Sequence, residues 1–322
     1  TVFTSFMMPP RLMASSTCFY TSCLRKYFIV SIIVYSIISS PPLLCEALSG
    51  STTNIPVQQE HNNKRSRRIP VIRYEDDWIC LNKPAGLSVH RTRDTRRNEV
   101  TLCSILKRQL ARKIYPVHRL DHRTSGAILF AFDAKSCTQI HEKLVQGQKE
   151  YIALLRGEWK YDNNQIIIDK PLKVNGVMKD AVTEFRLITK SLYDGMPCSL
   201  VLCQPTTGRT HQIRRHAYHL GHPIIGDRQH GDSKVNRLWR EQRNLNRLAL
   251  HCLSIDLLGH HSPCIAPLSL ELRQVLQQDT ELWETAIKID PRLLLDQVDE
   301  RGGSHGRNYR KRQLMEGTIS KE

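Results

Sequence analysis

Hydrophobic residues from about position 70 onward fall into short runs that predict strands more often than helices. Val71–Tyr74 and Trp78–Leu81 are apolar and rich in β-branched or aromatic residues, and an acidic turn separates them. The run "AILFAF" at 127–132 is typical of a fully buried strand. Further strands are predicted at 149–159 and near 166–168, 183–189, 199–203 and 248–255.

Helical spacing of apolar residues is found in four segments. In 101–113, leucine and isoleucine recur three and four residues apart behind Thr101, a plausible N-cap. The other predicted helices span 133–147, 211–221 and 269–288. Because strands outnumber helices and do not alternate with them regularly, we predict an α+β fold with a mixed, mostly antiparallel sheet and flanking helices.

The first seventy residues resemble a targeting sequence rather than a folded domain. Residues 27–40 are apolar apart from serines, Arg25 and Lys26 precede them, and "PPLLCEA" follows with small residues at a cleavage-site spacing. The apolar run is short for a membrane span. We therefore predict a signal-peptide-like leader over 1–47.

Residues 48–69 are basic, rich in Ser, Thr and Asn, and nearly free of acids, which is typical of a transit peptide or a disordered linker. A signal followed by such a segment is what import into a multi-membrane plastid needs. A mitochondrial address, a membrane anchor and a misplaced gene start are the alternatives. We expect the catalytic domain over 70–295, then a polar, basic, disordered tail over 296–322.

The charge balance points to a polyanionic partner. The chain has 47 Lys and Arg against 31 Asp and Glu, a net charge of +16. Nucleic acid is the first candidate and an anionic membrane surface the second. The ten cysteines form no C-x-x-C, and His216, His219 and His222 lack acidic or cysteine partners at ligand spacing. With no nucleotide-binding glycine motif either, we predict a reaction without metal or cofactor.

The stretch "VHRLDHRTSG" at 117–126 carries the candidate chemistry. It sets one acid, Asp121, among Arg119, Arg123 and two histidines, directly before a buried strand. Surface ion pairs contribute little to stability, so a stabilising role is a weak explanation. A carboxylate that must stay ionised in a desolvated site explains the cations better. Asp121 is therefore the candidate nucleophile or base.

A guanidinium is the group suited to keep such a carboxylate ionised, because it is always charged and binds carboxylates bidentately. Arg209, Arg214 and Arg215 are available on or before the predicted helix at 211–221. Tyr151, on the predicted strand at 149–159, is suited to stack on a base, or else it is a core residue.

These blocks resemble a known family. "HRLDHRTSG" is similar to the signature loop HRLDxxTSG of the RluA-type pseudouridine synthases. "NKPAGLSVH", "KEYIALLRG", "TGRTHQIRRH", "HPIIGD" and "RLALHC" resemble the other blocks of that family, in the same order, over about residues 70–290. Within the family, the run from "RRH" to "HGD" is most similar to the bacterial tRNA pseudouridine synthase C group, although 157–183 looks shorter here.

The resemblance implies a pseudouridine synthase fold with a central RNA-binding cleft and an isomerase that converts uridine to pseudouridine without a cofactor. In that group the substrate is a tRNA uridine where the acceptor stem meets the T stem. Asp121 would attack the nucleoside, at ribose C1′ or at uracil C6. An rRNA synthase and a non-catalytic RNA-binding factor with the same fold remain alternatives.

The resemblance also implies the substrate-binding residues. Apart from it, we expect a monomeric protein with no stable membrane association once the leader is removed. Arg119 would occupy the space of the flipped-out nucleotide, and Tyr151 would stack on the uracil. Arg214 would pair with Asp121, with Arg209 as the second candidate. Leu248 would pack on the base.

Overall fold

The computed structural model describes residues 68–91, 99–193 and 195–296, all of which belong to one compact unit, Asn63–Glu322. The leader predicted over 1–47, most of the linker predicted over 48–69, and all but the first residue of the tail predicted over 296–322 lie outside these residues. Within the described ranges, no helix is both long enough and apolar enough to cross a membrane.

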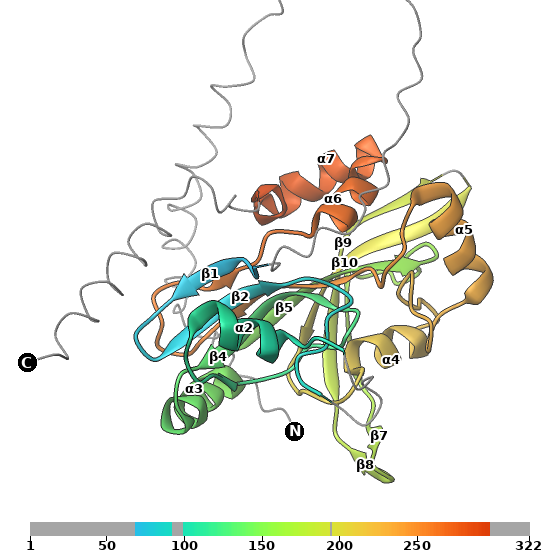
Figure 1. Ribbon diagram of the computed structural model, residues 1–322. Coiled ribbons are helices and arrows are strands. Elements are labelled where there is room, and N and C mark those ends of the chain that lie inside the picture. The colour runs from blue at the N-terminus through green and yellow to red at the C-terminus, as the bar shows by residue number, and fades with distance from the viewer. Residues whose placement is uncertain (1–67, 92–98, 194, 297–322) are drawn as a thin grey trace, which may run out of the picture. The chain divides into compact units, whose positions relative to one another are not determined.

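Ten of the described strands form one mixed sheet, with the main order β1-β2-β4-β11-β5-β10-β9-β6, and the other two form a separate hairpin (Figure 1). Only β4 and β11 pair in parallel, so the sheet is mostly antiparallel, as predicted. The strands are β1 (Val71–Tyr74), β2 (Trp78–Lys83), β4 (Ser125–Ala131), β5 (Gln148–Arg156), β6 (Gln165–Asp169), β9 (Val182–Tyr193), β10 (Met196–Pro205) and β11 (Leu250–Asp256), with the short β3 (Tyr115–Pro116) beside β4 and β12 (Cys264–Ile265) beside β11.

The helices begin and end where local capping groups permit. At α2, the Thr101 hydroxyl accepts from the Ser104 backbone N–H, and the Ser104 hydroxyl oxygen accepts from the Thr101 backbone N–H, which satisfies two otherwise unpaired donors. Asp133 caps α3 in a similar way. The described helices are α2 (Leu102–Leu110), α3 (Ala134–Gln146), α4 (Gln212–His219), α5 (Ser233–Arg243), α6 (Leu270–Gln277), α7 (Thr280–Ile289) and a 3-10 turn at Pro291–Leu294.

Three elements differ from the sequence-based expectation. The single helix predicted over 269–288 is wrong, because the Asp279 carboxylate accepts from the Leu282 backbone N–H and starts a new helix, α7. Helix α5 was not predicted, because its only buried side chain is Trp239 and its apolar stripe is too narrow to detect. The hairpin of β7 (Leu172–Val174) and β8 (Val177–Lys179) was missed because its strands are so short.

The centre of the sheet is where the chain approaches itself most closely. All seven residues of β4 are buried, as are the residues of β11 up to Ile255. Gly126 on β4 has φ +111°, and a Cβ there would lie 2.2 Å from the Cys252 carbonyl oxygen of β11. A side chain at this position would therefore push apart the two strands whose beginnings carry the Asp121 loop and Leu248.

The helices cover the sheet in separate groups. Helix α3 packs against β2, β3 and β4, whereas α4 packs against β9 and β10, and α7 packs against α6 and β9. In Figure 1, α6 and α7 are drawn above the sheet, and α3, α4 and the β7–β8 hairpin below it. Helix α4 thereby brings residues that follow β10 back toward the loop that precedes β4.

Candidate active site

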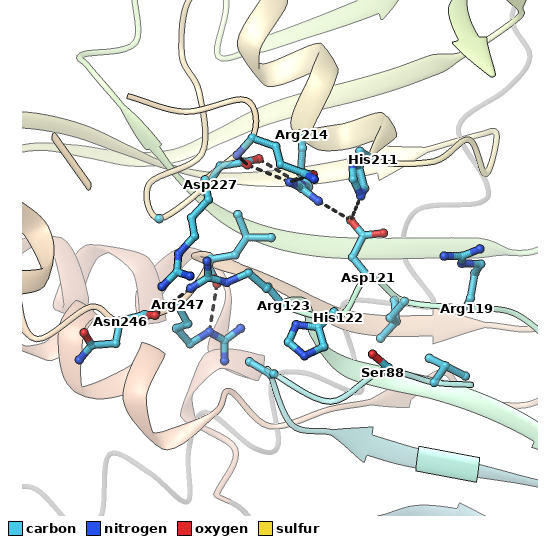
Figure 2. A pocket seen from close by; sticks show the side chains of 18 of the residues that line it. Ser88, Arg119, Asp121, His122, Arg123, His211, Arg214, Asp227, Asn246 and Arg247 are labelled. Carbon is cyan, nitrogen blue, oxygen red and sulfur yellow. Dashed lines mark hydrogen bonds and ion pairs between the residues drawn. The ribbon is translucent and has the colours of Figure 1, made fainter. Parts of the chain in front are cut away.

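A cavity of about 770 Å³ opens around the Asp121 loop (Figure 2). Five segments that are distant in sequence and two single residues, Glu99 and Glu271, form its wall. Together they contain more cationic and imidazole side chains than carboxylates. A cavity of this volume lies within the range of small-molecule sites and can admit one extruded nucleotide. The lining residues are Ala85, Gly86, Ser88, Val89, His90, Glu99, Arg119, Leu120, Asp121, His122, Arg123, His211, Arg214, Gly226, Asp227, Arg228, Gln229, Asn246, Arg247, Leu248 and Glu271.

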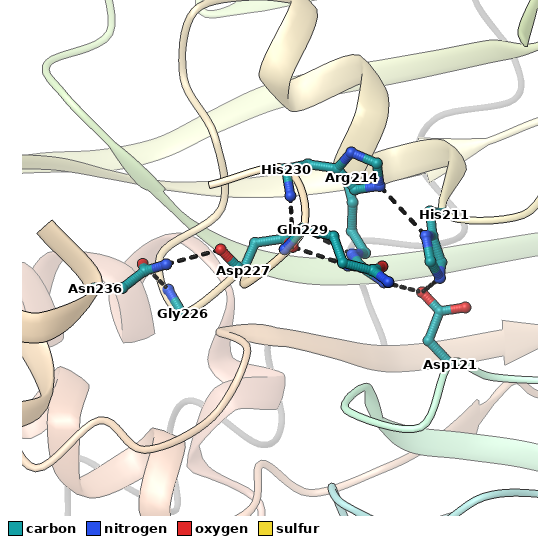
Figure 3. A network of polar contacts seen from close by, with 8 residues as sticks. All are labelled: Asp121, His211, Arg214, Gly226, Asp227, Gln229, His230 and Asn236. Atoms are coloured by element: carbon teal, nitrogen blue, oxygen red, sulfur yellow. Dashed lines mark hydrogen bonds and ion pairs between the residues drawn. The ribbon is translucent and has the colours of Figure 1, made fainter. Parts of the chain in front are cut away.

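Asp121 is held by one arginine, Arg214 of α4. Arg214 Nη1 donates to Asp121 Oδ2 over 3.1 Å. Another edge of the same guanidinium binds Asp227 bidentately: Nε donates to Oδ2 over 2.7 Å and Nη2 donates to Oδ1 over 2.8 Å. Nη2 also donates to Gln229 Oε1 over 3.0 Å (Figure 3). One guanidinium therefore bridges two carboxylates.

The Arg214–Asp227 pair is buried, and its charges support each other. Burial works to lower the pKa of Arg214, but hydrogen bonds and charge from Asp227 outweigh it, and the net shift is upward. Burial likewise works to raise the pKa of Asp227, and Arg214 reverses it, so the net shift is downward. The Asp227 carboxylate also accepts from the backbone N–H groups of Gln229 and His230. Arg214 is thus fixed before any substrate arrives.

A histidine pair approaches Asp121 from the other side. His211, in left-handed conformation before α4, places Nε2 at 3.8 Å from Asp121 Oδ2. Its Nδ1 lies 3.3 Å from Nε2 of His230 (Figure 3). Burial lowers the pKa of both histidines from their ordinary value of about 6.5, so both rings are neutral at pH 7. The polar groups described here all meet Oδ2 of Asp121, and among the described residues Oδ1 accepts no hydrogen bond.

Lys83, at the end of β2, fastens the neighbouring loop. Its ammonium is fully buried and donates to the carbonyl oxygens of Pro84, Leu87 and His122 at 2.8 to 3.3 Å. Burial lowers the pKa of Lys83 to about 7. Gly86 N–H also donates to His122 O. The loop after β2 and the Asp121 loop are therefore joined at His122.

Some of the predicted site residues line the cavity and others do not. Asp121, Arg119, Arg214 and Leu248 all line the cavity, with Arg119 exposed and Leu248 buried. Arg214 is the arginine that meets Asp121. Arg209 is not, because its Nε donates to Asp180 O, and it does not line the cavity.

Tyr151 lies in the middle of β5, between Cys203 of β10 and Cys252 of β11. It is 9% exposed, packs in the hydrophobic core and does not line the cavity. Burial, followed by the neighbouring Cys252, raises the pKa of Tyr151 well above its ordinary value. The phenol is therefore protonated at pH 7, and the core interpretation describes its position in the free protein.

Sequence reasoning missed three residues of the site: Asp227, His211 and Lys83. Asp227 had a usable signal, since it is an acid that directly follows an apolar run in a basic segment. It follows Gly226, whose φ is +81° and whose Cβ would lie 1.9 Å from Arg247 O. Lys83 lies in the block "NKPAGLSVH", but apart from that resemblance it looks like a lysine in an ordinary turn.

Known proteins match this chain over the same region. The RNA pseudouridylate synthase family profile matches residues 77–219. A protein named tRNA pseudouridine synthase C from Vibrio vulnificus is 32% identical over 232 residues, covering 66% of this chain and 94% of that protein. The chain belongs to the RluA-type family of RNA pseudouridine synthases. Another protein of the same name, from Pasteurella multocida, is 38% identical over 204 residues, covering 56% of this chain and 82% of its own.

As an RluA-type pseudouridine synthase, the protein is an isomerase, and the family and enzyme class implied by the sequence are confirmed. The solved structure of human RNA Pseudouridylate Synthase Domain Containing 4 superposes with a TM-score of 0.51 at 21% identity, covering 71% of this chain and 95% of that one. The predicted fold class is confirmed as well. Asp121, Tyr151 and Arg214 lie within the profile match, whereas Leu248 lies beyond it.

Proposed function

We propose that this protein isomerises uridine to pseudouridine in tRNA, with Asp121 as the catalytic group. The observation that carries the proposal is a carboxylate fixed by a buried Arg214–Asp227 pair inside a cavity rimmed with cations. The choice of tRNA is supported by the relatives named tRNA pseudouridine synthase C, one of which the chain covers over 94% of its length. A uridine where the acceptor stem meets the T stem is the proposed target.

Binding must extract the uridine from its stem. Flipping a base out costs a few kcal/mol in lost stacking and pairing. The basic surface offsets this cost through phosphate contacts, which makes binding sensitive to salt. Arg119 is exposed at the wall of the cavity, and we assign it to the space that the flipped nucleotide leaves in the helix.

The chemical step uses the free oxygen of Asp121. Arg214 holds Oδ2, so Oδ1 is left to attack the nucleoside at ribose C1′, or at uracil C6 in the alternative account. Attack at C1′ breaks the N1–C1′ bond, the uracil turns, and C5 bonds to C1′ while the bond from C1′ to Asp121 breaks and frees the carboxylate. In the alternative account, the bond from C6 to Asp121 breaks after C5 has bonded to C1′. In both accounts the C5 proton is lost and N1 gains a proton. Substrate and product are isomers, so the sum of these steps consumes no oxidant, reductant or cofactor.

Two apolar contacts are assigned to the uracil. Leu248 lines the cavity just ahead of β11 and is placed to pack on the base. Tyr151 is assigned to stack on the uracil, which requires the base to reach β5 because only 9% of this residue is exposed. A phenol that stays protonated favours stacking or proton donation over action as a phenolate base.

The test measures tritium released from C5 when the full chain acts on uridine-labelled tRNA and rRNA transcripts. We expect release from tRNA, and release at background for Asp121→Asn. The control is Glu158→Gln, which removes an equivalent charge from an exposed ion pair with Lys190. Full activity in Asp121→Asn would refute the role of Asp121. Release from rRNA alone would reassign the substrate, and RNA binding without release from any transcript would favour the non-catalytic alternative.

We also propose that residues 1–69 direct the protein into an organelle, a plastid first and a mitochondrion second, and that the processed protein is a monomer. The support is the apolar run at 27–40 followed by a basic segment poor in acids. A C-terminally tagged chain would be fractionated, extracted with carbonate and sequenced from its N-terminus. A protein that keeps residues 27–40 and resists extraction would identify the segment as a membrane anchor.

A further inference from the structure

Four arginines gather on one side of the cavity, where the Asp121 loop meets α5. We call Arg123, Arg228, Arg240 and Arg247 the arginine corner. A small cavity of about 40 Å³ lies between them, and its wall also includes Gly226, Asn236, Leu245 and Asn246. Three of the four arginines also line the large cavity. The exception is Arg240 of α5. The arginine corner is therefore an extension of the catalytic cavity toward α5. Figure 2 shows two of its members, Arg123 and Arg247, beside Asn246.

The charges of the arginine corner are not balanced by the protein. Within the described part of the chain, none of the four arginines forms an ion pair. Asp227, which directly precedes Arg228, is already occupied by Arg214 and two backbone N–H groups. Glu271 lines the large cavity and acts on Arg247 by its charge, but it forms no ion pair with Arg247. Arg247 is 5% exposed and donates only to neutral oxygens, those of Ser125, Leu248, Leu250 and Ser269.

Arg123 adds an unpaired buried donor to this excess of charge. Its Nη2 donates to Asn246 O over 2.9 Å, but its Nη1 is buried and has no partner among the described residues. Burial, and then the charge of Arg228, lower the pKa of Arg123. A buried charged donor without an acceptor is costly, and such groups usually mark a place where a ligand or ion belongs.

We propose that the arginine corner binds one phosphodiester of the substrate RNA, one or two nucleotides from the flipped uridine. Guanidinium groups bind phosphate oxygens bidentately and keep their charge when desolvated. The small cavity of about 40 Å³ is lined mainly by these arginines and two asparagines, so a group that enters it meets hydrogen-bond donors on several sides. The inference rests on the proposed function, because it assumes that the large cavity receives the uridine.

The distance along the chain supports this placement. Arg123 follows Asp121 by two residues, so their Cα atoms are at most about 7 Å apart. A phosphate held at Arg123 therefore belongs to the strand that carries the reacting nucleoside, close to it. Fixing the strand there turns phosphate-binding energy into the position of ribose C1′ against Asp121.

The experiment compares full-length variants in the Asp121→Asn background, where no turnover disturbs binding. Arg228→Gln and Arg240→Gln change exposed side chains, so they leave the core intact, and Arg123→Gln tests the buried donor. The matched control is Arg237→Gln, on the exposed surface of α5 and outside both cavities. We expect each corner variant to raise the Kd for tRNA about tenfold and the control to change it less than twofold.

A second arm identifies the phosphate. Single linkages around the target uridine are replaced by neutral methylphosphonates, and the Kd is measured for each RNA. We expect one linkage, within two nucleotides of the uridine, whose neutralisation weakens binding to the Asp121→Asn parent about tenfold and has little further effect in Arg123→Gln. The proposal would be overturned if, at every linkage, neutralising the phosphate weakened the binding of Arg123→Gln as much as that of the parent.

A third arm separates the RNA strand from a free anion. Inorganic phosphate is titrated against tRNA binding at constant ionic strength. Competition that Arg123→Gln abolishes, together with the linkage effect, supports the proposal. Competition without any linkage effect shows a free-phosphate site and overturns it. Because all three arms measure binding, they decide whether the arginine corner holds a phosphodiester even if tritium release shows the proposed function to be wrong.

Discussion

Asp227 is the residue whose change best tests how the site is built. The substitution Asp227→Asn keeps the size of the side chain but removes its charge. The carboxylate now accepts two bonds from Arg214, at 2.7 and 2.8 Å, and two from backbone N–H groups. An amide offers one oxygen and turns an NH₂ group toward a donor. Arg214 then loses a bidentate partner and keeps Asp121 and Gln229.

The expected loss has two parts. Asp227 is 1% exposed, and removing one charge from a buried pair typically destabilises a protein by about 3–5 kcal/mol. Native domains have roughly 5–15 kcal/mol in total, so we expect a folded variant with a much lower melting temperature. A guanidinium displaced by about 1 Å should slow the reaction about 10²-fold, or about 2.7 kcal/mol in the barrier.

The assay is single-turnover tritium release at saturating tRNA, at a temperature where circular dichroism shows the variant folded. We expect the loss in the rate constant rather than in KM, because Asp227 acts through Arg214 on Asp121. Glu158→Gln is the control, since its partner Lys190 and Glu158 itself are 50% and 60% exposed and such pairs contribute about 0–1 kcal/mol. An Asp227→Asn protein that melts early yet reacts at the normal rate would refute the reasoning.

Three further outcomes follow from the structure. Gly126→Ala should destabilise the protein by about 2 kcal/mol or more in urea unfolding, because the new Cβ would lie 2.2 Å from Cys252 O at a φ of +111°; an unchanged midpoint would show that β4 and β11 can separate. Burial holds the pKa of His251 at about 3, so the unfolded chain takes up a proton first, and the contribution of this histidine to stability, present above pH 6.5, should fall by about 2 kcal/mol at pH 5. His251→Gln should remove that part of the slope, whereas His118, whose pKa burial also lowers to about 3, still contributes its own part. Lys83→Met should slow tritium release about tenfold by freeing the loop that Lys83 fastens to His122 O, and a normal rate would show that Gly86 alone secures that loop.

Much of this protein could be predicted because the relevant interactions are local. Thr101 and Asp133 cap the helices that follow them through groups three residues away, so the helix starts were visible in the sequence. The run 127–132 is buried on both sides, as its continuous apolar composition predicted. Asp121 was visible because a lone acid among cations, directly before a buried strand, has few structural explanations.

The remaining features depend on contacts between distant segments. Arg214 and Asp121 are 93 residues apart, and only the packing of α4 against β9 and β10 decides that Arg214 reaches Asp121 while Arg209 turns to Asp180 O. Tyr151 fits a core strand and a base-stacking site equally well by pattern, and its burial follows from the position of β5 between β10 and β11.

The sequence by itself determined most of the long strands, the caps of α2 and α3, the charge that suits RNA and the acid at the centre of the site, since each follows from a residue and its near neighbours. The tertiary structure alone decided the partner of that acid, the role of Asp227 and the convergence of four arginines that lie up to 124 positions apart. The physical reason is that strand order and helix packing set which distant side chains share a desolvated space, and no local pattern encodes that order.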